Sequence, residues 1–406
     1  MKFVLFLIWM ASTIDVTSSL QLAGFRSTGV LWSVVSFCVI LYTLHTYPFD
    51  RIPLSPLRNN AWVLFAFAYY CLRSINSDNF LYAIVDLQSL FLPTMIGLLS
   101  YETVQSYNDC QEIEATVLKS IVVPLTLLGI GITTGLSTFV EGIGQKGFIG
   151  ARSVSLYGIT VLSVAIPVLI YDKANTKKKH LALFAAGICF FCILATLSRT
   201  ALLSSIIMLL FAGVLTMNIK KFAKSFIVII FVIIIALKWG PMAERLMPNN
   251  AESLGDVAQS GEFTSGRALL WTYIFQEGLQ HPIMGTGTGN VKTLIESNMR
   301  SSGILPHNEY LRFFYDGGII GLSIICTALL SRLRRHLNDW RNALRKNDFM
   351  CAKWNLAALL VTLAMATSAL FENVFLYQFM LCIAFTIYGI TDKLSDLKPI
   401  INSDFN

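Results

Sequence analysis

The side chains most able to do chemistry gather at the start of one hydrophobic stretch. An imidazole, an amide, a carboxylate and a guanidinium (His307, Asn308, Glu309 and Arg312) lie within seven positions of Pro306, directly before an apolar run. Charged groups at the end of a membrane-spanning helix cost free energy and are usually functional. The ordinary pKa of histidine suits a general base near pH 7. We therefore predict that His307 is catalytic and takes the proton of a hydroxyl nucleophile. The alternatives are that it only orients the acceptor through a hydrogen bond, or is structural.

Other residues of this stretch are predicted to support the histidine. Asn308 can cap the helix that follows, and Asp316 can pair with Arg312 four residues away. Gly318 and Gly321, three residues apart in an apolar helix, indicate close helix packing.

Three arginines, Arg152, Arg199 and Arg267, each stand at the beginning of a predicted helix. The planar fork of arginine binds phosphate through two parallel hydrogen bonds. An arginine at a helix end can instead reach toward lipid phosphates. Taken together with His307, the three arginines predict a diphosphate site, with Arg152 the weakest of them.

Composition requires these residues to be positioned by membrane helices. Of 406 residues 55% are hydrophobic and 14% are charged, and mean hydropathy is +0.62. Soluble domains are nearer 25% charged. The net charge of +7 is spread over short loops between apolar runs, which does not indicate nucleic-acid binding.

Twelve apolar runs are near the length of about 20 residues that a spanning helix needs. They lie near 1–20, 28–46, 60–75, 79–100, 116–139, 153–171, 180–197, 200–219, 222–239, 309–330, 355–371 and 373–391. Residues 1–11 of the first run also resemble the hydrophobic region of a signal peptide. We predict an all-α polytopic membrane protein with nine spans in 1–240, a large outer loop at 241–308, three spans in 309–392 and a tail at 393–406.

Lysine and arginine counts set the orientation. With both termini cytoplasmic, twenty of the 31 fall on the cytoplasmic side, as the positive-inside rule requires. The three arginines and His307 then share the outer face.

The large loop is predicted to contain two short helices, at about 266–279 and 290–299. Both helices can lie on the membrane surface and cover a cavity beneath them. The glycines of 285–289 indicate a tight turn rather than a phosphate loop, since no Gly-Lys-Ser/Thr follows. His281 is interpreted as a helix-end residue.

At these residues the chain resembles the O-antigen ligase and O-antigen polymerase superfamily. His307-Asn308, nine residues, Gly318, two residues and Gly321 is similar to its His-Asn-x9-Gly-x2-Gly signature, and Arg199-x3-Leu203 to its Arg-x3-Leu motif. The segment from Ser265-Gly266-Arg267 to Asn290 resembles its loop pattern. His281 departs from that pattern, in which Asn often precedes the proline.

The resemblance implies transfer of a glycan from undecaprenyl diphosphate to an acceptor sugar on the outer face of the bacterial inner membrane, without nucleotide sugar, metal or other cofactor. An inverting displacement is expected, with a chain-length regulator as a further partner. The pattern 306–312 looks slightly more like capsule and exopolysaccharide polymerases than like ligases, whose acceptor is lipid A–core. A transporter or lipid flippase is the alternative from another class, and would use Asp15 and Asp86 within spans.

Overall fold

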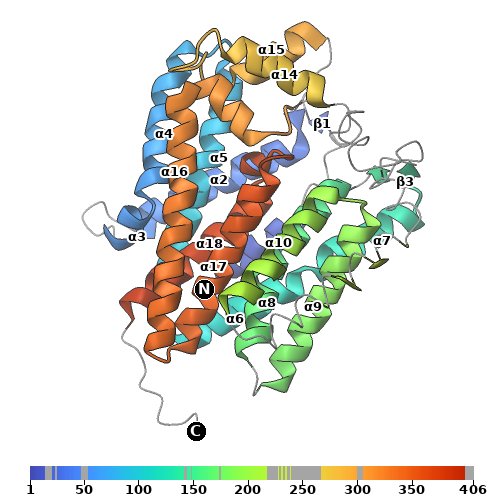
Figure 1. The fold of residues 1–406 in the computed structure, drawn as a ribbon, viewed down its shortest axis with the longest axis vertical. Helices are drawn as coiled ribbons and strands as arrows, with labels where there is room; N and C mark the ends of the chain where they lie inside the picture. The colour runs from blue at the N-terminus through green and yellow to red at the C-terminus, as the bar shows by residue number, and fades with distance from the viewer. Residues whose placement is uncertain are drawn as a thin grey trace.

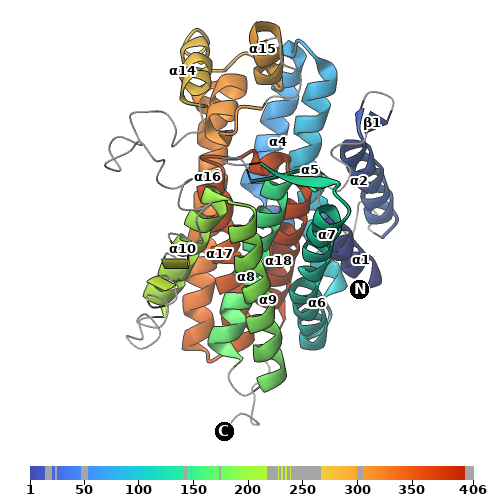
Figure 2. The same ribbon diagram turned by 90° about the vertical axis from the view of Figure 1, so that its right-hand side faces the viewer.

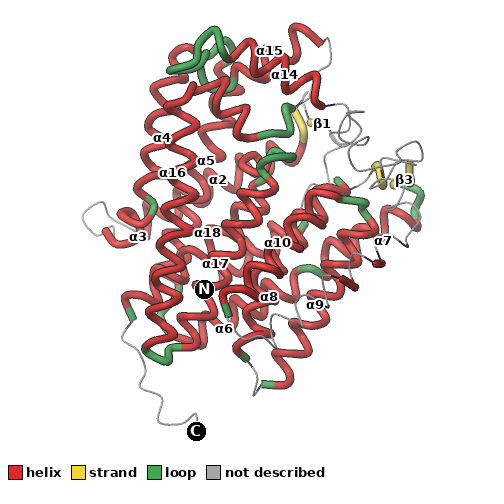
Figure 3. The backbone as a smooth tube through the Cα atoms, viewed as in Figure 1, coloured by secondary structure: helices red, strands yellow, loops and turns green. Residues whose placement is uncertain are grey.

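Helices make up most of the computed structural model of this chain (Figure 1, Figure 3). The structure describes residues 1–13, 21–22, 25–46, 54–140, 144–147, 149–172, 175–216, 267–299 and 305–397, with isolated positions between 227 and 238. Most of the predicted span at 222–239, the linker before the first loop helix, Asp15 and the residues after 397 lie outside the described part.

The N-terminal half contributes helices α1 to α10. Their bounds are α1 Lys2–Ser12, α2 Ser27–Thr46, α3 Leu54–Asn59, α4 Ala61–Arg73, α5 Phe80–Thr103, α6 Tyr107–Ser120, α7 Val122–Thr133, α8 Ala151–Tyr171, α9 Thr176–Ala195 and α10 Arg199–Leu215, with a 3₁₀ turn η2 at Ser74–Asn76. The remaining elements are α14 Arg267–Gly278, α15 Asn290–Met299, α16 Glu309–Arg345, α17 Phe349–Ser368, the 3₁₀ turn η4 Val374–Leu376 and α18 Gln378–Asp396.

Six of the described helical stretches are long and apolar enough to cross a membrane. They are α5, the continuous pair α6 and α7, α8, α9, α16 and α17, while α1, part of α2 and α10 are shorter apolar helices. The protein is therefore an integral membrane protein, although the predicted number of twelve spans stays a prediction.

Helix α17 lies at the centre of the bundle. It packs against α8, α10, α16 and α18, and α18 packs in turn against α5. Most residues of α17 are buried, which explains why its sequence is apolar on every side. Figure 1 shows α8, α9 and α10 on one side of this centre and α4 on the other, and Figure 2, turned by 90°, shows α8 and α9 in front of α17 and α18.

Two short antiparallel hairpins accompany the helices of the predicted all-α fold. One pairs β1 Gln21–Leu22 with β2 Phe25–Arg26, and the other pairs β3 Ser137–Val140 with β4 Gly144–Gly147. The second hairpin leads into α8, which begins next to Arg152.

Two helices end later in the chain than the sequence predicts. The span predicted to end near residue 330 stays helical from the kink at Gly318 to Arg345, and the last helix runs to Asp396 instead of ending near 392. Both extensions contain charged residues, and a prediction from hydrophobicity ends a membrane span before such residues.

The two ends of the bundle differ in their chemistry. At one end, Lys353 of α17 forms ion pairs with Glu114 at 2.6 Å and Asp172 at 2.7 Å. The opposite end holds the beginnings of α8, α10 and α16 and the end of α17, beneath α14 and α15 (Figure 1). Every sequence-predicted site residue that the structure describes lies toward this opposite end.

Candidate active site

His307 occupies a strained turn directly before α16. Its φ is +52°, in the left-handed region that residues other than glycine rarely adopt. The Asn308 side chain caps α16 by accepting a bond from the Leu311 amide at 3.0 Å, as the sequence predicted. The His307 amide donates to Asn373 Oδ1 at 2.9 Å, and the Glu309 amide donates to the Ala369 carbonyl at 2.8 Å. Such strain persists where the surroundings fix the backbone, often at functional sites.

The imidazole of His307 faces a carboxylate that the sequence analysis missed. Nδ1 lies 3.3 Å from Glu372 Oε2 and 3.1 Å from Asn373 Nδ2. The ionised carboxylate can only accept and favours a proton on Nδ1, whereas the Asn373 amide nitrogen can only donate and favours a lone pair there. A bond to a charged carboxylate is the stronger of the two, so it selects the tautomer with the proton on Nδ1. That tautomer leaves Nε2 with the lone pair of a general base.

Local electrostatics favour a neutral imidazole on His307 and an ionised carboxylate on Glu372. Burial lowers the pKa of His307 below its ordinary value, and the charges of Arg267 and Arg152 lower it further, while Glu372 acts in the opposite direction. Burial alone would raise the pKa of Glu372, but the His307 hydrogen bond and the two arginines bring it below its usual value. Near pH 7 the imidazole is therefore neutral and the carboxylate ionised.

Arg267 reaches the site from the first turn of α14. Its Nη1 donates to the Phe371 carbonyl at 2.7 Å, one residue before Glu372. Trp271, one helical turn later, donates from Nε1 to the Pro306 carbonyl at 2.7 Å and packs on the Phe371 ring. Helix α14 thus fixes both chain segments that carry His307 and Glu372.

Arg152 and Arg199 complete the cationic cluster from the beginnings of α8 and α10. Nε of Arg152 lies 3.8 Å from Glu372 Oε1, and its charge acts on both Arg199 and Arg267. Arg199 follows a turn in which Leu197 has φ +51° and Ser198 caps α10. Among the described residues, Glu372 lies in ion-pair range of Arg152 and within hydrogen-bond reach of His307, so one carboxylate stands beside the guanidinium groups of this cluster.

The supporting residues Glu309 and Arg312 belong to a buried charge network next to the site. Glu309 accepts from Arg312 Nε at 2.5 Å and from the Phe375 amide at 3.0 Å. Arg312 also pairs with Asp86 at 2.9 Å, and Asp86 pairs with Lys292 at 2.7 Å. The network joins α5, α15, α16 and η4. Asp86 is occupied in structural ion pairs, which does not favour the transporter hypothesis.

Asp316 does not make the predicted bond to Arg312. Its carboxylate accepts from the Gly289 amide at 3.1 Å and the Val291 amide at 2.9 Å, so it caps α15. Free amides at a helix N-terminus attract a carboxylate, and this long-range partner replaces the local one.

The glycine-rich turn at 285–289 is tight, as predicted, and its amides are used internally. Those of Gly285, Thr286, Gly287, Thr288 and Gly289 donate to protein acceptors, and all three glycines have positive φ. No amide of this turn is left to cradle a phosphate.

Gly318 and Gly321 both sit at close contacts. Gly318 has φ +64° and breaks the helical path of α16, and a Cβ there would meet the Ile283 carbonyl oxygen at 2.2 Å. A Cβ on Gly321 would meet the Tyr70 hydroxyl of α4 at 2.4 Å. The predicted packing role is confirmed, and Gly318 adds a kink.

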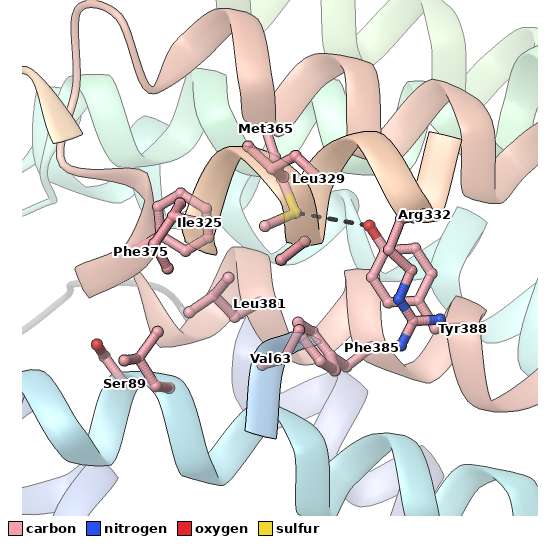
Figure 4. A pocket seen from close by; sticks show the side chains of 12 residues that line it. Val63, Ser89, Ile325, Leu329, Arg332, Met365, Phe375, Leu381, Phe385 and Tyr388 are labelled. Carbon is pink, nitrogen blue, oxygen red and sulfur yellow. Dashed lines mark hydrogen bonds between the residues drawn. The ribbon is translucent and has the colours of Figure 1, made fainter. Parts of the chain in front are cut away.

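A small cavity of about 40 Å³ lies away from this cluster. Figure 4 shows its apolar wall, with Leu329, Met365 and Phe385, and Arg332 beside Tyr388 at one end. None of His307, Glu372 and the three arginines lines it. It is too small and too apolar for a sugar.

Comparison with known families bears on these residues. The family model described as O-Antigen ligase matches residues 184–326. The resemblance to the O-antigen ligase and polymerase superfamily is confirmed. The match contains Arg199, Arg267, His307, Gly318 and Gly321. No curated protein matched the chain.

Two members of the cluster lie outside the segment that matches the O-antigen ligase family. Arg152 precedes it and Glu372 follows it. His281, the departure from the family pattern, is exposed at the end of α14, so it stays a helix-end residue. Glu372 had one sequence signal: it is the only charged residue between Lys353 and Asp392.

Proposed function

We propose that this protein transfers a glycan from undecaprenyl diphosphate to the hydroxyl of an acceptor sugar, on the outer face of the bacterial inner membrane. The observation that carries the proposal is that Arg152 of α8 and Arg267 of α14 act on the His307–Glu372 pair. Arg199 at the start of α10 is near enough for its charge to act on both arginines. The family match supports glycan transfer of the O-antigen ligase or polymerase type.

The guanidinium groups of the cluster suit the donor. A diphosphate that links a lipid to a sugar carries about two negative charges near neutral pH, and gains another as leaving group. Arg199 and Arg267 bind it, and Arg152 adds charge from a more exposed position. Guanidinium groups stabilise the departing diphosphate, so the proposed reaction needs no metal or other cofactor.

His307 acts on the acceptor. The acceptor hydroxyl attacks C1 of the donor sugar from the face opposite the diphosphate. Its proton passes to His307 Nε2 as the new C–O bond forms, and the bond from C1 to the diphosphate oxygen breaks. Glu372 holds the imidazole and stabilises its charged form. The product has inverted configuration, and free undecaprenyl diphosphate leaves.

Polymerisation of O-antigen, capsule or exopolysaccharide repeat units is the activity we favour, with the growing chain passed to another lipid-linked unit. The alternative is ligation to lipid A–core. Purified protein in lipid nanodiscs, given the lipid-linked repeat unit and each acceptor in turn, tests both. Longer lipid-linked glycans support polymerisation, and a glycosylated core supports ligation. Failure to consume the donor with either acceptor would overturn the proposal.

A further inference from the structure

The turn after α14 exposes apolar side chains beside the kink of α16. Ile283 is 63% exposed and Met284 51%, and Ile319 and Ile320, just beyond Gly318, are also exposed. The turn is held firmly to the bundle, because the amides of Ile319 and Ile320 donate to the carbonyls of Pro282 and Ile283 at 2.8 and 3.3 Å. This patch is therefore a fixed part of the surface.

The neighbouring helix continues the patch. Leu72 of α4 is 67% exposed and Ile75 of η2 81%. Between them, Arg73 turns inward and donates from Nη2 to the Gly285 carbonyl at 2.9 Å. Two adjacent elements thus expose apolar residues around the same turn.

Helix length places this patch at membrane depth. From Ile319 to Leu333, α16 exposes no charge, because Arg332 is buried against Asn60 and the Tyr388 ring. Arg334 is the first exposed charge toward the other end. These fifteen residues extend about 22 Å at 1.5 Å per residue, whereas the hydrocarbon core is about 30 Å thick. The apolar surface must continue past Ile319, and Ile283 and Met284 stand where it continues.

The backbone of the turn is suited to this depth. Irregular backbone enters the hydrocarbon region only where its polar groups are bonded within the protein. The carbonyls of Pro282, Ile283 and Gly285 accept bonds, as described, and the amides from Gly285 to Gly289 all donate to protein groups. The turn therefore satisfies most of its backbone polar groups without water, and the amides of Ile283 and Met284 are the donors in it that have no acceptor within the described protein.

We propose that the turn at residues 282–284 is inserted into the outer leaflet of the bilayer, with Ile283 and Met284 against lipid chains. The occupant of this patch is lipid, because the patch continues the lipid-facing surface of α16. The segment predicted as a loop outside the membrane thereby gains a lipid-embedded anchor that fixes α14, and with it Arg267, at a set height above the bilayer.

Spin-label accessibility tests the insertion. Single cysteines replace Met284 or Ile283 in a background freed of the eight native cysteines, and the labelled protein is placed in nanodiscs. Ser297 on α15 and Leu330 on α16, both exposed, serve as matched water and lipid controls. The proposal expects M284C and I283C to favour oxygen over a water-soluble nickel chelate several-fold more than S297C, approaching L330C.

Two outcomes would overturn the proposal. Nickel accessibility at both positions equal to that of S297C would place the turn in water. Exclusion of both reagents would place a protein partner, such as a chain-length regulator or a second copy, on the patch instead of lipid. Both results are independent of transfer activity, so they do not depend on the proposed reaction.

Discussion

Glu372 Oε2 lies 3.3 Å from His307 Nδ1, although 65 positions separate the two residues in the chain. The same carboxylate has its second oxygen 3.8 Å from Arg152 Nε. Glu372 therefore links the proposed base to the proposed diphosphate clamp. It orients His307 through Nδ1 and leaves Nε2 for the acceptor.

Replacing Glu372 by Gln should slow transfer by about 10- to 100-fold, a part of the 10² to 10⁴ that a general base contributes. The amide keeps the shape of the side chain but no longer selects the Nδ1–H tautomer. Rates of the purified variant measure this, with Glu296→Gln on α15 as control. An unchanged rate would contradict the orienting role.

The Glu372→Gln variant should also change the pH profile. Glu372 raises the pKa of His307 against the larger effect of burial, so its removal lowers that pKa further. The acid limb of the rate profile should move to lower pH than in the wild type. A purely structural loss would reduce the rate at every pH without moving the limb.

In the wild-type protein, transfer should be nearly independent of pH above about 6.5 and fall at lower pH. The base must be neutral, and burial keeps the pKa of His307 below its ordinary value. Activity is therefore full above that lowered pKa and is lost as the pH falls through it. A rate that rises with pH well above 7 would be inconsistent with His307 as the base.

Lysine at position 199 or 267 should reduce transfer about tenfold or more, since the charge stays while the bidentate fork is lost. Arg152→Lys should have a smaller effect. Initial rates at saturating acceptor, with protein levels matched, are the measurement. Arg334→Lys at the far end of α16 is the control, and full activity in both Arg199→Lys and Arg267→Lys would refute the clamp.

Asp86→Asn should destabilise the protein by about 3–5 kcal/mol, because it leaves Arg312 and Lys292 buried without their shared carboxylate. Thermal unfolding in detergent measures this, with Asp78→Asn in the exposed turn before α5 as control. If the Asp86→Asn variant has normal stability but no longer transports lipid or glycan, the result would support the transporter hypothesis instead.

Sequence patterns predicted what depends on local composition. The apolar runs around α5, α8, α16 and α17, the cap at Asn308 and the two loop helices all follow from periodicity and turn chemistry. His307, Arg199 and Arg267 were predicted from their side-chain chemistry and their places at the starts of predicted helices, and the family signature marks the same residues. The structure brings them together with Arg152, as the common face predicted.

Contacts between residues far apart in the chain could not be predicted from these patterns. Asp316 has Arg312 one turn away, yet it caps α15, because the amides of Gly289 and Val291 arrive from another segment. Glu372 sits in a short connection with no periodic signal, and only its isolation among uncharged residues marked it. The kink at Gly318 depends on the carbonyl of Ile283, which no local pattern reveals.

The most direct test of the central claim compares His307→Gln with wild type in purified nanodiscs loaded with the undecaprenyl diphosphate-linked repeat unit. Glutamine can keep a hydrogen bond to the acceptor but cannot take its proton at neutral pH. We predict that the variant still binds the donor but releases almost no undecaprenyl diphosphate and makes almost no longer glycan, a loss of about 10² to 10⁴ in rate. Near-normal transfer by His307→Gln would contradict the base role and leave His307 only to orient the acceptor.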